Sequence, residues 1–158
     1  MKAPSRQIVI YSSILVSTFV WIGFVCAISF MEAWLKFRAP NVSLSTGLSI
    51  GKLIFSALNK VEWILGGISI TAAFLDNHSP KLVKSPFLVI PILILVLQTF
   101  WLLPSLNERA DIIIHGLNTL PSAVHLYYLI LEFAKIFLLF MLGTSVVCRL
   151  TNVHKEIW

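Results

Sequence analysis

The stretch from Pro121 to Cys148, PSAVHLYYLILEFAKIFLLFMLGTSVVC, is long and apolar enough to cross a bilayer, yet it contains ionisable side chains. His125, Tyr128, Glu132 and Lys135 follow one another at spacings of three, four and three residues. A helix therefore places these four residues on one stripe. Because an ionisable group in hydrocarbon is costly, the stripe must face protein or water rather than lipid.

The composition indicates that the rest of the chain shares this environment. Of the 158 residues, 58% are hydrophobic and only 12% are charged, whereas soluble chains carry about 25% charged residues. The apolar runs predict four transmembrane spans, at about residues 7–31, 48–75, 86–104 and 121–148. We therefore predict an all-α, single-domain protein over residues 1–158. It would be an integral-membrane bundle of four transmembrane helices in up-down-up-down order.

Prolines and glycines mark the expected ends of the spans. Ala39-Pro40 should end the first helix, because the residue before a proline leaves the helical region. Pro86 suits the first turn of the third span. Two alternatives stay open for residues 105–119. The segment extends the third helix beyond the membrane, with Gly116 as its end, or it forms a separate helix at the interface.

The distribution of lysine and arginine predicts the orientation in the membrane. The side shared by both termini and the loop after the second span would carry Lys2, Arg6, Lys81, Lys84, Arg149 and Lys155. The other side would carry Lys36, Arg38 and Arg109, with Lys52 near the border. We expect a multi-pass protein of the cytoplasmic (inner) membrane with both termini in the cytoplasm, and the first apolar run is interpreted as a retained span. The net charge of +5 then reflects topology, and no nucleic-acid partner is expected.

The second span carries polar residues at the depth of the charges in the fourth. At about 1.5 Å per residue, Glu62 and Lys135 each lie about 20 Å below the start of their spans. Lys60 and Glu132 each lie roughly 17–18 Å below the start. Equal depths predict two cross-helix pairs, Glu62–Lys135 and Lys60–Glu132. The predicted intramembrane cluster consists of Asn59, Lys60, Glu62, His125, Tyr128, Glu132 and Lys135.

Two interpretations of this cluster remain open. The charges are neutralised pairs that fix helix register, or they line a solvated cavity or ion path. A charge at the bilayer centre costs at least about 2.5–3.5 kcal/mol on insertion scales, and four such groups exceed what packing requires. We therefore expect solute or ion binding or transport, in a homo-oligomer or larger membrane complex. The alternative is a non-catalytic accessory or structural subunit of a larger membrane complex.

A second set of ionisable residues comes from the outer ends of the spans. It consists of Glu32, Lys52, Glu108, Arg109, Asp111 and His115. The HxxxH and HExxH spacings are absent from the sequence, so no metal ligand is assigned. A membrane-bound redox or metal protein using His115 and His125 is a third interpretation. GxSxG and phosphate-binding glycine loops are also absent, so we predict no catalytic residue and no cofactor, and we do not favour an enzyme.

Four segments carry a resemblance to known proteins. They are GFVCAISFMEAWLKFRAP, IGKLIFSALNKVEW, PSLNERADIIIHG and SAVHLYYLILEFAK, which cover more than a third of the chain. Their arrangement resembles small four-helix bacterial membrane proteins of unknown function. More loosely, it is similar to the group that includes copper-resistance-D-like proteins and the eukaryotic transmembrane protein 205. The resemblance implies an integral-membrane protein without an assigned reaction. The chain departs from that group in lacking a methionine- or histidine-rich copper motif, and no functional residue is carried over.

Overall fold

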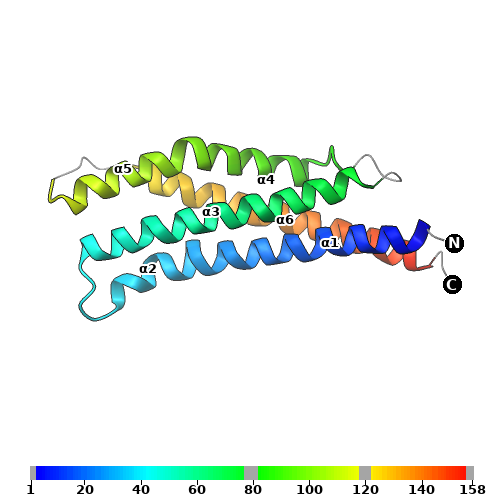
Figure 1. Ribbon diagram of the computed structural model, residues 1–158, viewed down its shortest axis with the longest axis horizontal. Coiled ribbons are helices and arrows are strands. Elements are labelled where there is room, and N and C mark those ends of the chain that lie inside the picture. The colour runs from blue at the N-terminus through cyan, green and yellow to red at the C-terminus, as the bar shows by residue number, and fades with distance from the viewer. Residues whose placement is uncertain (1–2, 77–81, 118–121, 156–158) are drawn as a thin grey trace.

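The chain forms an all-α bundle in the computed structural model, which describes residues 3–76, 82–117 and 122–155. Figure 1 shows long helical stretches lying side by side, with both ends of the chain at the same end of the bundle. In the described residues, four stretches are long and apolar enough to cross a membrane: Arg6–Arg38, Leu44–Phe74, Pro86–Ile114 and Val124–Val153. The predicted fold class is therefore confirmed, and the architecture is that of a multi-pass membrane protein.

The first span is one continuous helical stretch of four segments. They are α1 (Ala3–Val25), the π-helical η1 (Cys26–Glu32), α2 (Ala33–Leu35) and the 3₁₀ turn η2 (Lys36–Arg38). The stretch ends where the sequence predicts, because Ala39 before Pro40 is extended, with ψ 135°. Asn41 then adopts a positive φ of 65°, which completes the short turn into the second span.

The second span is the single helix α3 (Leu44–Phe74). It begins before the apolar run that predicts it, because the side chain of Ser43 accepts a hydrogen bond from the Thr46 backbone N–H at 3.1 Å. This is an N-cap, which satisfies one of the free N–H groups in the first turn. Its buried face includes Leu58, Glu62, Gly66 and Ser69.

The third span decides the alternative left open for residues 105–119. The segments α4 (Pro86–Leu97), the π-helical η3 (Gln98–Leu102) and α5 (Leu103–Ile114) follow one another without a break, so residues 105–114 extend the third helix, while residues 118 and 119 lie outside the described part of the chain. Gly116, with φ 77°, ends it. The N–H groups of Gly116 and Leu117 donate to the carbonyls of Ile113 and Ile112, both at 3.0 Å. This pair of bonds is a Schellman motif, which favours glycine.

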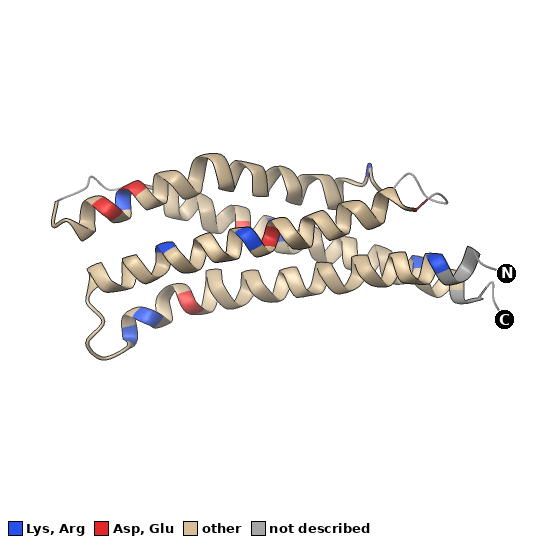
Figure 2. Ribbon diagram, viewed as in Figure 1, with Lys and Arg blue, Asp and Glu red and all other residues tan. Residues whose placement is uncertain are grey.

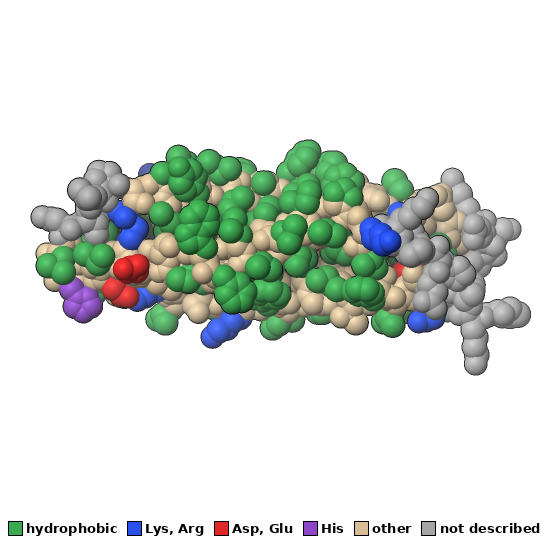
Figure 3. Space-filling view, turned by 90° about the horizontal axis from the view of Figure 1, so that it is seen from above, with side chains coloured by type: hydrophobic (Ala, Val, Ile, Leu, Met, Phe, Trp, Pro, Cys, Tyr) green, Lys and Arg blue, Asp and Glu red, His purple; other side chains and the backbone are tan. Residues whose placement is uncertain are grey.

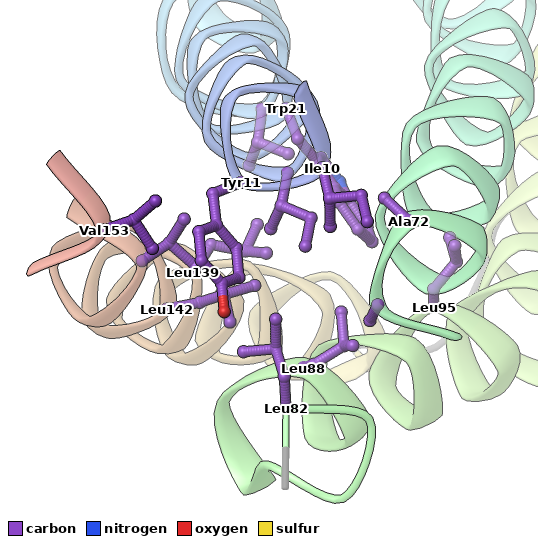
Figure 4. Packing of buried hydrophobic residues seen from close by; sticks show 14 residues of the cluster. Ile10, Tyr11, Trp21, Ala72, Leu82, Leu88, Leu95, Leu139, Leu142 and Val153 are labelled. Carbon is purple, nitrogen blue, oxygen red and sulfur yellow. The ribbon is translucent and has the colours of Figure 1, made fainter. Parts of the chain in front are cut away.

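The fourth span, α6 (Val124–Lys155), packs against α1 and α4, and α1 also packs against α3. Trp21, Leu95, Leu139 and Leu142 are fully buried where these helices meet. Figure 4 shows Leu139 and Leu142 lying among the core side chains of the other helices. Aliphatic side chains from all four spans thus form one core, to which Tyr11 and Leu88 also belong.

The outer surface of the bundle is apolar along most of its length. In Figure 3, hydrophobic side chains cover the middle of the visible face, and charged side chains gather mainly near the ends. Many large apolar side chains are exposed, including Leu53, Phe100 and Phe133. Figure 2 shows charge also in the middle of the bundle, on α3 and on the helix behind it. A surface of this kind suits lipid, whereas those central charges that are buried require partners inside the bundle.

Candidate functional site

Three charged side chains lie completely buried in the middle of the bundle. Glu62 comes from α3, whereas Glu132 and Lys135 come from α6, and all three have 0% exposure. The Lys135 ammonium is ion-paired with Glu62 across the two helices, which confirms the predicted pair. The same ammonium lies 3.2 Å from Glu132 Oε2, one turn earlier on its own helix. One lysine therefore serves two carboxylates.

Gln98 links the lysine to the second carboxylate. Its Oε1 accepts a hydrogen bond from Lys135 Nζ at 2.6 Å, and its Nε2 donates to Glu132 Oε1 at 3.1 Å. The opposite amide orientation would turn the NH₂ group toward the ammonium, so these two neighbours fix the amide. Gln98 opens the π-helical segment η3, and such segments often occur at functional sites.

Trp21 brings the first span to the same place. Its Nε1 donates to Glu62 Oε1 at 2.8 Å, and the indole is fully buried. Gly66 makes room for this ring, because a Cβ there would lie 3.2 Å from Trp21 Cη2 and 2.9 Å from Ile92 Cδ1. The close approach explains why a glycine stands one turn after Glu62 on the inner face of α3.

Tyr128 completes the group. It is 2% exposed, stands one turn before Glu132 on α6, and interacts with the carboxylates of Glu132 and Glu62. Its ring packs edge-on against Phe55, with the centroids 5.5 Å apart. We call this group the polar centre; its members are Trp21, Glu62, Gln98, Tyr128, Glu132 and Lys135.

Two of these residues lie outside the predicted cluster. Gln98 is the one amide in the predicted third span, which is mostly apolar, and this was the signal in the sequence that could have identified it. Nothing in the sequence distinguishes Trp21 as a hydrogen-bond donor from a tryptophan that only packs. Both are needed because burial requires that polar atoms find partners.

The predicted Lys60–Glu132 pair is wrong. Lys60 is exposed on the outside of α3, and Glu132 pairs with Lys135 and Gln98 instead. Side chains that are two positions apart on a helix, as Lys60 and Glu62 are, point in directions about 200° apart. Once Glu62 faces the interior, Lys60 must face outward.

Asn59 lies beside the polar centre rather than in it. Its Nδ2 donates to Thr99 Oγ1 at 2.8 Å, and Trp63 Nε1 donates to the same oxygen at 3.0 Å. Thr99 in turn donates to the Leu95 carbonyl at 2.7 Å. These bonds join α3 to the third span and contact none of the three buried charges.

The charges of the polar centre do not balance when all three are ionised. Two carboxylates and one ammonium leave one negative charge in excess in a part of the bundle without exposure. Glu62 Oε2 is buried without a hydrogen-bond donor. Glu132 Oε2 accepts no hydrogen bond either, although Lys135 lies 3.2 Å away as an ion-pair partner. Buried acceptors without donors are costly, so the centre has capacity for one more positive group.

The remaining predicted residues lie at the end of the bundle remote from the termini. His125 lines a cavity there together with Lys36, Lys52 and Phe55. We call this cavity the end pocket. It does not include Glu132, so the structure separates His125 from the buried charges. The two sites meet where the Phe55 ring, in the lining of the end pocket, packs against the ring of Tyr128 in the polar centre.

The predicted outer-end set is divided into smaller groups. Lys52 is ion-paired with Asp111, and Glu32 with Lys36 at 3.3 Å. His115 is exposed, and its Nδ1 lies 2.7 Å from the Asp111 carbonyl oxygen. Glu108 is exposed and Arg109 is half-buried. Among the described residues, no three His, Cys, Asp or Glu side chains are grouped to hold a metal ion.

The polar centre is closed. Glu62, Glu132 and Lys135 have 0% exposure, and none of them lines any of four cavities identified among the described residues. Comparison of the chain with models of protein families, with curated proteins and with solved structures finds no match.

Proposed function

We propose that the protein binds a proton at the polar centre and that this binding serves ion or solute transport across a membrane. The supporting observation is the second carboxylate. Glu62 and Lys135 alone would form a neutral pair sufficient to fix helix register. Glu132 adds a negative charge that the described interior does not neutralise. A proton on one carboxyl group removes this excess and supplies an O–H donor.

Glu132 is the proposed proton acceptor. Glu62 Oε1 accepts hydrogen bonds from two donors, the Trp21 indole and the Lys135 ammonium, so this oxygen is already satisfied as an acceptor. The other groups that interact with Glu132, Gln98 and Tyr128, are neutral, and it shares the lysine with Glu62. Protonation of Glu132 weakens its attraction to Lys135 and leaves the cross-helix pair with Glu62 intact.

The proposed access route starts at the end pocket. His125, Tyr128 and Glu132 occupy one stripe of α6 that runs inward from this pocket. The Tyr128–Phe55 ring contact closes the stripe between the pocket and the charges. A proton therefore reaches Glu132 only when these two rings separate, so access is gated.

The proposed setting is the cytoplasmic membrane, with both termini in the cytoplasm. The bias of lysine and arginine toward the side that holds the termini supports this orientation. A reporter fused to the C-terminus that is active only in the cytoplasm should be active. Activity only of a reporter that works outside the cytoplasm would overturn the orientation.

Infrared spectroscopy of the protein in nanodiscs tests proton binding. We expect a carbonyl band of a protonated carboxylic acid that shifts slowly on transfer to heavy water. Glu132→Gln should remove this band, whereas Glu108→Gln, which changes an exposed carboxylate at the bundle end, should leave it unchanged. A spectrum without such a band, or one that Glu132→Gln does not change, rejects proton binding at this residue.

Proteoliposomes containing a trapped pH dye test transport. An imposed membrane potential should acidify the lumen faster than in protein-free vesicles, and Glu132→Gln should abolish the difference. Glu108→Gln again serves as the control. Rates equal to those of protein-free vesicles would reject a proton path. The infrared band would then show whether a closed binding site remains.

The second candidate function is that of an accessory subunit in a membrane complex, and Lys60 favours it. This lysine is exposed on α3, about 24 Å from the start of the helix at Leu44 and thus near the bilayer centre. A charge facing lipid at that depth is costly, so a neighbouring protein would stabilise it. The exposed Ile64, one turn away, would belong to the same contact face.

Photo-crosslinking in native membranes tests this candidate. A photoreactive residue at position 64 should give a crosslinked product, whereas one at the exposed Leu93 of the third span should not. Lys60→Leu should reduce the product at position 64. Equal yields at both positions, or a yield unaffected by Lys60→Leu, would contradict a partner on this face.

A further inference from the structure

The end pocket is a second place where the interior can hold a small molecule. Its volume is about 230 Å³, and it lies between the end of the first span, α3, α5 and the beginning of α6. Water occupies about 30 Å³ per molecule in the liquid. Bonded atoms take somewhat less room than free waters, so the space corresponds to a ligand with roughly eight to ten non-hydrogen atoms.

The charged groups that line the end pocket are both basic. They are Lys36 and Lys52, and His125 adds an imidazole. Their acidic partners, Glu32 and Asp111, hold the two ammonium groups from outside the lining. At this end of the bundle the described basic residues Lys36, Arg38, Lys52 and Arg109 outnumber the acidic residues Glu32, Glu108 and Asp111. The pocket thus favours an anion.

The Lys36 ammonium is held in position by its surroundings. Its side chain is only 10% exposed, and Nζ lies 5.4 Å from the Phe37 ring centroid and 5.6 Å from that of Phe55. Gly51 provides the space beneath it, because a Cβ there would lie 2.8 Å from Nζ. The only hydrogen bond of this ammonium among the described residues goes to Glu32 at 3.3 Å, so donors remain for a ligand.

The rest of the end pocket is mainly apolar. Phe37, Phe55, Leu103 and Leu106 form much of its wall. Few polar groups on an apolar wall are typical of small-molecule sites, where the polar groups fix orientation and the wall excludes water. We infer that the end pocket binds a medium-chain fatty acid, with its carboxylate at Lys36 and Lys52 and its chain against the phenylalanine rings.

The position of the pocket indicates how such a molecule arrives. Lys36, Lys52 and His125 all lie near helix ends, where a bundle of this kind meets the membrane interface. A fatty acid in a bilayer carries its carboxylate at this level. Fatty-acid binding does not depend on the proposed proton centre, because no member of that centre lines the pocket.

Crosslinking to a photoreactive octanoate in nanodiscs of phosphatidylcholine tests the inference. Mass spectrometry should place the adducts on residues 33–37 and 48–55, and unlabelled octanoate should compete. Lys36→Gln should weaken competition about tenfold, since one charge-assisted contact is lost. Lys84→Gln, a matched change of an exposed lysine at the other end, should have no effect.

Two further variants keep the test decisive. Gly51→Ala retains every charge but displaces the Lys36 ammonium, so it should also weaken octanoate binding, even if Lys36→Gln fails to fold. Glu132→Gln should bind octanoate as the native protein does, which separates this site from the proton centre.

Three results would overturn the inference. Equal competition by octanol would show that the carboxylate is not recognised. Displacement by phosphatidylglycerol in the nanodiscs, with no effect of octanoate, would assign the pocket to a phospholipid head group. Adducts spread evenly over all four spans would show partition into the bilayer rather than binding.

Discussion

Lys135 and Glu132 lie one turn apart on α6, with Lys135 Nζ 3.2 Å from Glu132 Oε2, and neither side chain is exposed. Ion pairs at this spacing on an exposed helix surface contribute little to the stability of the helix. Breaking such a pair in a buried position costs much more stability, because the removal of one partner leaves the other charge in a medium that does not solvate it. Here the lysine also neutralises Glu62, so the fold depends on it more than on either carboxylate.

Lys135→Met should destabilise the protein by about 3–5 kcal/mol, the usual cost of breaking a buried ion pair by removing one partner. Both Glu62 and Glu132 lose their cation in this variant. Titration of dodecyl sulfate into mixed micelles gives the free energy of unfolding. The matched change Lys60→Met removes an exposed lysine from mid-membrane and should not destabilise the fold. Equal losses in both variants would show that burial does not govern the effect.

Gln98→Met should cost about 1–3 kcal/mol, because Glu132 Oε1 loses its donor and Lys135 loses an acceptor while the volume stays similar. The same unfolding titration measures the change. Leu97→Met in the preceding position is the control, since Leu97 is exposed. An unchanged stability for Gln98→Met would mean that the amide bridge contributes nothing to the fold.

Gly66→Ala should be less stable than Gly67→Ala by about 1–3 kcal/mol, the usual cost of overpacking. A Cβ at position 66 would meet Trp21 and Ile92, whereas nothing lies within 4 Å of a Cβ at position 67. Both variants gain the same helix propensity, about 1 kcal/mol, so their difference reports the contact alone. Thermal unfolding in nanodiscs measures it, and the opposite order would contradict the close approach of Trp21.

Tyr11→Phe should cost about 1.5–3 kcal/mol, the range for a hydrogen bond to a charged group. The Tyr11 hydroxyl donates to Asp76 Oδ2 at 3.0 Å in a buried position near the termini. Tyr127→Phe removes an exposed hydroxyl from α6 and should be neutral. Unfolding in dodecyl sulfate distinguishes the two. A similar effect of both changes would show that the hydrogen bond from Tyr11 to Asp76 does not stabilise the fold.

Much of the site follows from periodicity and depth. The spacing of Tyr128, Glu132 and Lys135 predicts their shared face, and equal depth predicts the pair between Glu62 and Lys135. Such features are properties of single helices, whose rise and turn are fixed. The inclusion of Lys60 fails because sequence depth gives height along the helix but not the direction of the side chain. Gln98 escapes prediction because the polar residue beside it, Thr99, points about 100° away on the helix, so the two do not define one inward face.

The sequence by itself determined four membrane-length helices, their order, the end of the first helix at Ala39 before Pro40 and the need to shield the charges of α6. Hydrophobicity and local backbone preferences suffice for these features, since each acts within one segment. Only the tertiary structure decided that Lys135 serves two carboxylates, and that Trp21 and Gln98 complete their coordination. It also placed His125 in a separate pocket. Rotation of each helix about its axis is set by side chains on the other three, so no segment contains this information alone.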